Sequence, residues 1–174
     1  MGLAFFGETH EKMDRAALAP IASHMMKAAL ANLVNDGYVA FAIMIIGKDS
    51  TITPMAIESS SKEATGRFLR ALSPHVDAII IISEAWTLMK DDIDELAFAV
   101  PVSQHPKRVE GVFVNAQSPN GELLLTTTFK RDADGKPVVD GEINQNWTDA
   151  PLRSVGNFCN LFGSESPSPV DRCE

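Results

Sequence analysis

The chain has 174 residues, of which 45% are apolar and 22% are charged, which suits one ordinary domain with a real core. The net charge of −8 works against binding a phosphate backbone, which needs clustered lysine and arginine, so we expect no nucleic-acid partner. The two cysteines, Cys159 and Cys173, form no CxxC pair, so we expect a reduced, cytoplasmic setting rather than a disulfide framework.

The N-terminus lacks a basic region followed by an apolar run, so we expect no secretory signal. The most apolar windows, residues 39–46 and 78–82, are far shorter than the roughly 18 residues of a membrane helix. They are typical of buried strands, and we expect no membrane association. The sequence also has no P-loop, no zinc-ligand spacing and no serine-hydrolase motif, so no cofactor and no metal is expected.

Residues 10–36 have the periodicity of a helix, and Gly37 is a suitable residue to end it. Pro20 is expected to divide this region into a short first piece and a longer second helix that begins near the proline. The apolar positions recur at helical spacing and predict one buried stripe: Leu18, Ile21, Ala22, Met25, Ala29 and Leu33.

Residues 38–46 are apolar at nearly every position, which predicts a strand that is covered on both faces or central in a sheet. A turn and a second strand, residues 51–57, complete a hairpin, and Pro54 indicates an edge position because proline cannot donate to the ladder. Ser60 and Glu63 then match a capping box. It predicts a helix to about Leu72, with a buried face of Phe68, Leu69 and Leu72.

Strands are predicted at residues 79–88, 108–117, 122–129 and 138–147, with a short helical turn at 91–97. The alternation in 122–129 is typical of a half-exposed antiparallel strand. Residues 151–174 have little periodicity, and we expect an irregular tail that is disordered from residue 164.

The predicted order is therefore α-β-β-α-β-β-β-β. It indicates a single α+β domain over residues 1–150, with an antiparallel or mixed sheet of about six strands. We expect its helices to lie mainly on one face of that sheet.

Glu84 is the first candidate for chemistry. By the side-chain period of two, it continues the apolar row of Ile80 and Ile82 and is followed on that side by Trp86. A carboxylate buried there without a partner could act as a general acid or base. The alternative that we favour is a structural ion pair with an arginine or lysine at the strand end.

Symmetric pairing of strands 79–88 and 108–117 would place Glu84 near Glu110 and Trp86 near Arg108, with His105 at the same end of the sheet. Such a cluster could bind a metal or activate water. We favour the other interpretation, in which Arg108 neutralises the two carboxylates and stacks on Trp86.

Residues 82–86 read Ile-Ser-Glu-Ala-Trp, and residues 105–110 read His-Pro-Lys-Arg-Val-Glu. A Ser-Glu-Ala-Trp strand end followed by a His-Pro-x-Arg-x-Glu loop resembles a family of small uncharacterised bacterial proteins, a domain of unknown function. The resemblance covers roughly residues 38–140. It implies a soluble bacterial protein, and it carries over no substrate and no catalytic residue.

Three functions remain open. The first is a non-catalytic domain that acts through protein–protein contacts as a homo-oligomer, because no catalytic pattern is recognisable and the strand at 51–57 offers an exposed edge. The second is a metal-assisted hydrolase with Glu84, His105 and Glu110 as catalytic candidates and Arg108 binding an anionic group. The third is a small-molecule binding module with Trp86 lining a pocket.

Overall fold

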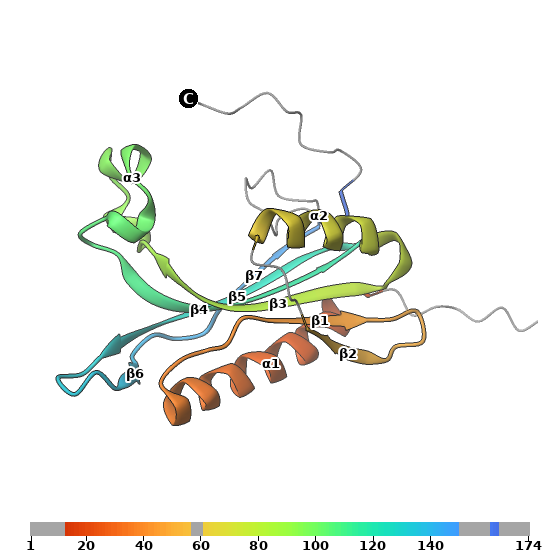
Figure 1. Cartoon of the computed structure of the whole chain (residues 1–174), viewed down its shortest axis with the longest axis horizontal. Coiled ribbons are helices and arrows are strands. Elements are labelled where there is room, and N and C mark those ends of the chain that lie inside the picture. Colours follow the sequence, from red (N-terminus) through yellow and green to blue (C-terminus); the bar gives the residue numbers. More distant parts are fainter. Residues whose placement is uncertain (1–12, 57–60, 150–160, 164–174) are drawn as a thin grey trace, which may run out of the picture.

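The computed structural model of the chain describes residues 13–56, 61–149 and 161–163. Three helices and seven strands occur in these residues (Figure 1). In chain order they are α1 (Arg15–Asp36), β1 (Ala42–Ile46), β2 (Ile52–Met55), α2 (Lys62–Leu72), β3 (Ala78–Thr87), α3 (Leu96–Ala99), β4 (Val109–Ser118), β5 (Gly121–Arg131), β6 (Pro137–Val139) and β7 (Asn144–Thr148).

All strand pairs are antiparallel, in the order β2-β1-β3-β4-β5-β6, and β7 pairs with β5. The predicted α+β class is thus confirmed. The predicted hairpin is also present: β1 and β2 pair, and Pro54 lies in β2 at the edge of the sheet. Residue 57, the end of the predicted second strand, lies outside the described residues.

The last predicted strand, residues 138–147, is wrong as one unit, because two strands occupy it. β6 pairs with residues 129–131 of β5, and β7 pairs with residues 122–126. Between them the chain approaches β5 at Gly141, whose N–H donates to the Thr128 carbonyl at 3.3 Å. A Cβ at Gly141 would lie 2.5 Å from Thr128 Oγ1, so this close passage requires glycine.

Helix α1 covers one face of the sheet. The Asp14 side chain caps its start by accepting from the Ala17 N–H at 3.1 Å, and Gly37 ends it at φ 83°. Its buried stripe packs on inward side chains of β3, β4 and β5: Leu18, Ala22, Met26, Ala29 and Leu33. The centre of the stripe is Met26, and the predicted Met25 is only partly buried beside it.

The expected break at Pro20 is wrong, because α1 is continuous from residue 15 to residue 36. Pro20 is the sixth residue of the helix and lies on its exposed side. The lost hydrogen bond is the one to the carbonyl of Ala16, which solvent can reach, since that residue is also exposed. The packing of the stripe carries the helix through this position.

Helix α2 covers part of the opposite face. Its cap is the Ser61 side chain, which accepts from the Ala64 N–H at 3.2 Å, whereas the predicted cap, Ser60, lies outside the described residues. Leu69 is buried in a second core with Ile79 and Ile81 of β3 and with Leu161. Phe68 was expected in that core but is 53% exposed.

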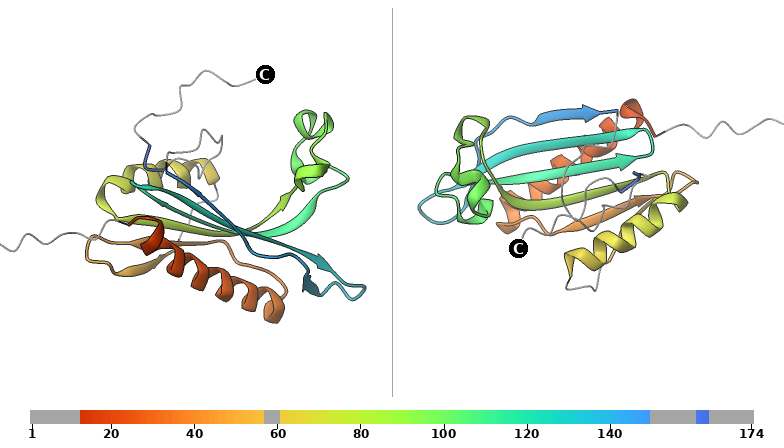
Figure 2. Two further views of the ribbon diagram at one scale, coloured as in Figure 1. Left: turned by 180° about the vertical axis from the view of Figure 1, so that it is seen from behind. Right: turned by 90° about the horizontal axis from the view of Figure 1, so that it is seen from above.

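The two longer helices therefore lie on opposite faces of the sheet, not mainly on one (Figures 1 and 2). Ile80 and Ile82 face α1, and Ile79 and Ile81 face α2, by the alternation of β3. A sheet covered on both faces explains why residues 78–82 are apolar without alternation.

By length and composition alone, α1 passes a test for a membrane-spanning helix, the only one in the described part of the chain to do so. The core helix of a soluble protein passes the same test. In this structure the apolar stripe of α1 is buried against the sheet.

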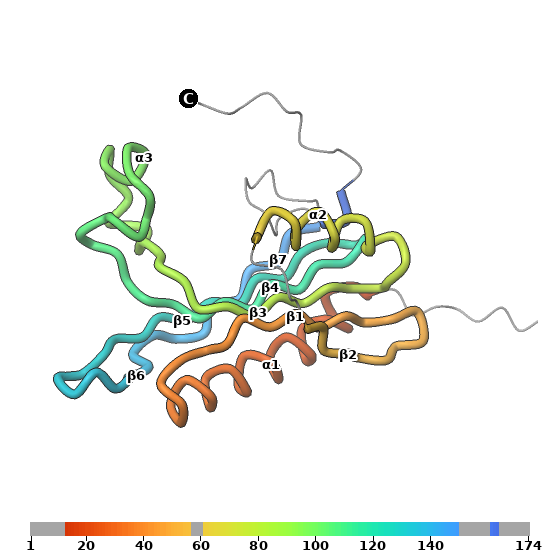
Figure 3. Tube along the Cα trace, in the orientation of Figure 1, coloured from red at the N-terminus to blue at the C-terminus, as the bar shows by residue number. Residues whose placement is uncertain are grey.

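The connection from β3 to β4, residues 88–108, stands away from the sheet and carries α3 (Figures 1 and 3). We refer to it as the β3–β4 lobe. It consists of the single turn of α3 between two short 3-10 turns, Lys90–Asp92 and Val102–Gln104.

Candidate functional site

Glu84 lies on β3 at the C-terminal end of α1, and its side chain is 23% exposed. Its Oε2 accepts a hydrogen bond of 3.0 Å from the Val39 N–H. Its Oε1 lies 3.3 Å from Nη2 of Arg131. The carboxylate therefore has a partner for each oxygen.

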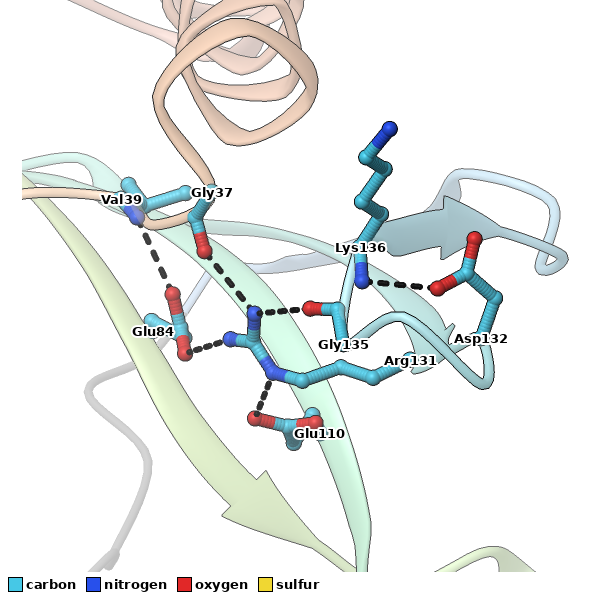
Figure 4. A network of polar contacts seen from close by, with 8 residues as sticks. All are labelled: Gly37, Val39, Glu84, Glu110, Arg131, Asp132, Gly135 and Lys136. Carbon is cyan, nitrogen blue, oxygen red and sulfur yellow. Dashed lines mark hydrogen bonds and ion pairs between the residues drawn. The ribbon is translucent and has the colours of Figure 1, made fainter.

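Arg131, at the end of β5, is the cation that the sequence analysis missed. Figure 4 shows its guanidinium between two carboxylates and two backbone carbonyls. Nε lies 3.2 Å from Glu110 Oε1, and Nη1 donates to the Gly37 carbonyl at 3.0 Å and to the Gly135 carbonyl at 3.5 Å. The Gly37 carbonyl belongs to the C-terminal end of α1, where a positive charge is favoured.

The Arg131 cluster, which we define as Gly37, Val39, Glu84, Glu110 and Arg131, joins α1 to three strands. The turn after β5 supports it. Asp132 Oδ1 accepts from the N–H groups of Asp134 and Lys136 at 2.9 and 2.8 Å. These bonds close a turn at residues 132–135, in which Gly135 has a positive φ of 77°.

The register of β3 against β4 differs from the symmetric one by two residues. Glu110 pairs with Trp86, and Glu84 pairs with Val112. The prediction assumed that a loop closes symmetrically, but the connection is the folded β3–β4 lobe, which imposes no such symmetry. Because the shift is two residues and not one, every side chain keeps the predicted face.

Trp86 and Arg108 do meet, as the sequence suggested. The guanidinium carbon of Arg108 lies 4.7 Å from the centre of the Trp86 ring, within the range of a cation–π contact. Nη1 of Arg108 also donates to the His105 carbonyl at 3.2 Å. Arg108 therefore has the predicted stacking partner, while Arg131 has the carboxylates that were assigned to Arg108.

His105 is fully buried inside the β3–β4 lobe. Its Nδ1 accepts from the Lys107 N–H at 3.2 Å, so the proton of the neutral ring is on Nε2, which points at Asp94 Oδ1 at 3.1 Å. The bond from His105 lowers the pKa of the Asp94 carboxyl. Asp94 also accepts from the N–H groups of Leu96 and Ala97, so the pair fixes the start of α3.

The catalytic candidates thus divide into two groups: Glu84 and Glu110 meet on Arg131, and the His105 ring is turned to Asp94. In the described ranges 13–56, 61–149 and 161–163, no three histidine, cysteine, aspartate or glutamate residues are placed to hold a metal ion. The contacts of Arg131 neutralise the carboxylates of Glu84 and Glu110, and the contacts of His105 fix the backbone of the lobe.

A buried polar group that the sequence analysis overlooked lies on the α2 face. Glu122 is only 6% exposed and accepts a hydrogen bond of 2.7 Å from Asn115 Nδ2. Burial raises the pKa of its carboxyl. Gln117, which is opposite Glu122 in the ladder, accepts from the Leu161 N–H at 2.8 Å. A pocket of about 30 Å³, which suits a water molecule or two, adjoins Glu122 and Gln117.

The β3–β4 lobe also exposes large apolar side chains. Phe98, in α3, is 85% exposed, the highest value among the exposed large apolar residues of the described chain. Others on the lobe or at its base are exposed as well: Trp86, Met89, Ile93 and Leu96. The short apolar run at residues 96–100 is visible in the sequence, but only the tertiary structure shows that this run is exposed.

Comparisons with known proteins identify no relative. No protein-family model matches the chain, and no curated protein and no solved structure matches it either. The resemblance to a bacterial domain of unknown function stays a prediction.

Proposed function

We propose that this protein is a non-catalytic binding domain that acts through protein–protein contacts, and that it self-associates through the β3–β4 lobe. The observation that carries the proposal is the exposure of Phe98 on an element that internal contacts hold in place. Phe98 is accompanied on the lobe by the exposed side chains of Ile93 and Leu96, and covering such apolar surface with a partner would favour association by removing it from water.

Contacts within the lobe hold it in a fixed conformation, as a preformed binding surface requires. His105 and Asp94 fix α3 from inside, and Lys107 Nζ lies 3.4 Å from Asp92 Oδ1. The stack of Arg108 on Trp86 holds the base of the lobe on the sheet. Because the lobe is already ordered, binding through it costs less conformational entropy than ordering a loop.

Metal-assisted hydrolysis by Glu84, His105 and Glu110 has less support. Arg131 occupies both carboxylates, and the His105 ring is bonded on both nitrogens within the lobe. A general base needs a lone pair directed at the proton that it removes, and a metal ligand needs one directed at the metal ion.

The test is the oligomeric state of the wild-type protein and of Phe98→Ser, measured by sedimentation velocity over a wide range of concentration. We expect the wild type to self-associate and Phe98→Ser to shift the equilibrium to the monomer by at least ten-fold in Kd, as for a central aromatic contact.

Val138→Ser is the matched control, because Val138 is an exposed apolar residue of β6, outside the lobe. It should leave self-association unchanged. A wild-type protein that stays strictly monomeric, or a Phe98→Ser variant that associates like the wild type, would overturn the proposal.

A further inference from the structure

The surface that would receive the lobe also lies on this chain. We infer that the β3–β4 lobe of one copy docks on helix α2 of a second copy, and that the reverse contact forms at the same time, giving a two-fold symmetric dimer. The inference rests on the proposed function and adds to it the surface that receives the lobe.

The charges of the two elements are opposite. All four acidic residues of the lobe lie in its tip, residues 90–98, which also carries one lysine and has a net charge of −3. Lys107 and Arg108 at the base of the lobe bring its total charge to −1, and Lys107 pairs with Asp92. Helix α2, residues 62–72, carries three basic residues and one glutamate, a net charge of +2. In a chain of net charge −8, two copies repel each other on average, so a stable contact should join patches of opposite sign.

Each patch also has an exposed aromatic residue. Phe98 is exposed in the lobe, and Phe68 is exposed on α2, with Arg67 beside it in the sequence. The exposure of Phe68 is what the sequence did not predict, since the apolar face of α2 was expected to be buried as a whole. Apolar contact between such aromatic residues, combined with contacts between charged residues, is common in protein interfaces.

The placement of the two elements permits reciprocal docking. The lobe and α2 stand on the same side of the sheet, opposite α1, and at different ends of it (Figures 1 and 2). A two-fold axis between the lobe and α2 therefore places each lobe over the α2 of the partner copy. Such an interface is self-complementary and closes, so it yields dimers and not open chains.

Two charge-reversal variants test this pairing without depending on which residues touch. One carries Asp91→Lys and Glu95→Lys in the lobe, and the other carries Lys62→Glu and Arg67→Glu in α2. All four residues are exposed, so the fold is expected to survive, which circular dichroism and thermal melting verify. Alone, each variant should dimerise at least ten-fold more weakly than the wild type, because both of its contacts join like charges.

Mixed in equal amounts, the two variants should form a heterodimer at close to wild-type affinity. In that species one contact is of wild-type charge and the other has both signs reversed, so both contacts attract. Native mass spectrometry separates the species by mass. The matched controls are Lys136→Glu and Glu142→Arg, charge reversals at exposed positions outside the lobe and α2. Each control variant should dimerise with the affinity of the wild type.

The outcomes separate the inference from the proposed function. A wild-type dimer that Phe98→Ser abolishes, but that the α2 reversal leaves intact, would overturn the inference and keep the proposed function. Absence of heterodimer from the mixture would overturn the inference in the same way. A wild-type monomer would overturn both, and a rescued heterodimer would support both.

Discussion

Nη2 of Arg131 lies 3.3 Å from Oε1 of Glu84, although 47 positions separate the two residues in the chain. Through the same guanidinium, Arg131 reaches Glu110 and the carbonyl of Gly37. One side chain therefore ties the end of α1 to β3, β4 and β5. This contact explains why an acidic residue stands in an apolar row of β3.

Replacing Arg131 with alanine should lower the free energy of unfolding by about 1–2 kcal/mol. The change leaves two half-buried carboxylates side by side without a cation, and it removes the donor to the Gly37 carbonyl. Chemical denaturation measures the effect. Lys130→Ala is the control: Lys130 is more exposed than Arg131 and pairs with Asp140, so its replacement should lower the free energy of unfolding far less. Equal losses would contradict the role of Arg131.

Glu84→Ala should destabilise the protein more than Glu110→Ala, by about 0.5–1.5 kcal/mol. Both changes remove a partner of Arg131, but only Glu84 also accepts from the Val39 N–H. Denaturation curves for the two variants give the difference directly, and Glu142→Ala, at an exposed position, sets the baseline. Identical curves for the two variants would mean that the bond to Val39 adds nothing.

His105→Ala should loosen the β3–β4 lobe while the sheet remains intact. The change removes the bonds of the ring to Asp94 and to the Lys107 N–H and leaves a cavity, which costs roughly 1–3 kcal/mol of local stability. Hydrogen exchange read by mass spectrometry should show faster exchange across residues 90–104, with β4 and β5 unchanged. His75→Ala, at an exposed position, is the control, and it should leave the lobe protected. Exchange that accelerates equally in lobe and sheet would contradict a local role.

Glu122→Gln should stabilise the protein at pH 7. Burial raises the pKa of the Glu122 carboxyl, so its ionised form is less favourable in the folded state than in the unfolded chain. The stability associated with this group is fully present below its unfolded pKa and is lost as the pH rises through the folded pKa. Glutamine keeps an oxygen that can accept from Asn115 and has no charge to bury.

The advantage of Glu122→Gln over the wild type should therefore shrink as the pH falls from 7 to 4. Unfolding in denaturant at a series of pH values measures it. The exposed Glu142→Gln variant should track the wild type at each pH. A Glu122→Gln advantage that is constant with pH, or a loss of stability at pH 7, would show that burial of the charge is not the cause.

Local sequence was sufficient for most elements of the fold. Period-two alternation placed β5, the unbroken apolar run placed β3 within the sheet, and Gly37 marked the end of α1, where the backbone needs a positive φ. Local sequence failed at Pro20, because the packing of α1 outweighed the preference of proline to break a helix. It also failed at Gly141, where a close approach to β5 separates β6 from β7.

The same division runs through the candidate site. Alternation along β3 placed Glu84 on the side of Ile80 and Ile82, and the interpretation favoured from the sequence was an ion pair with an arginine or lysine. The sequence by itself could not select Arg131, because that choice depends on the register of β3, β4 and β5. Nor could the sequence by itself predict that the His105 ring points at Asp94 or that Phe98 is exposed. Alternation is a local property of the backbone, whereas register, partner choice and exposure depend on contacts between residues far apart in the chain, which only the folded molecule supplies.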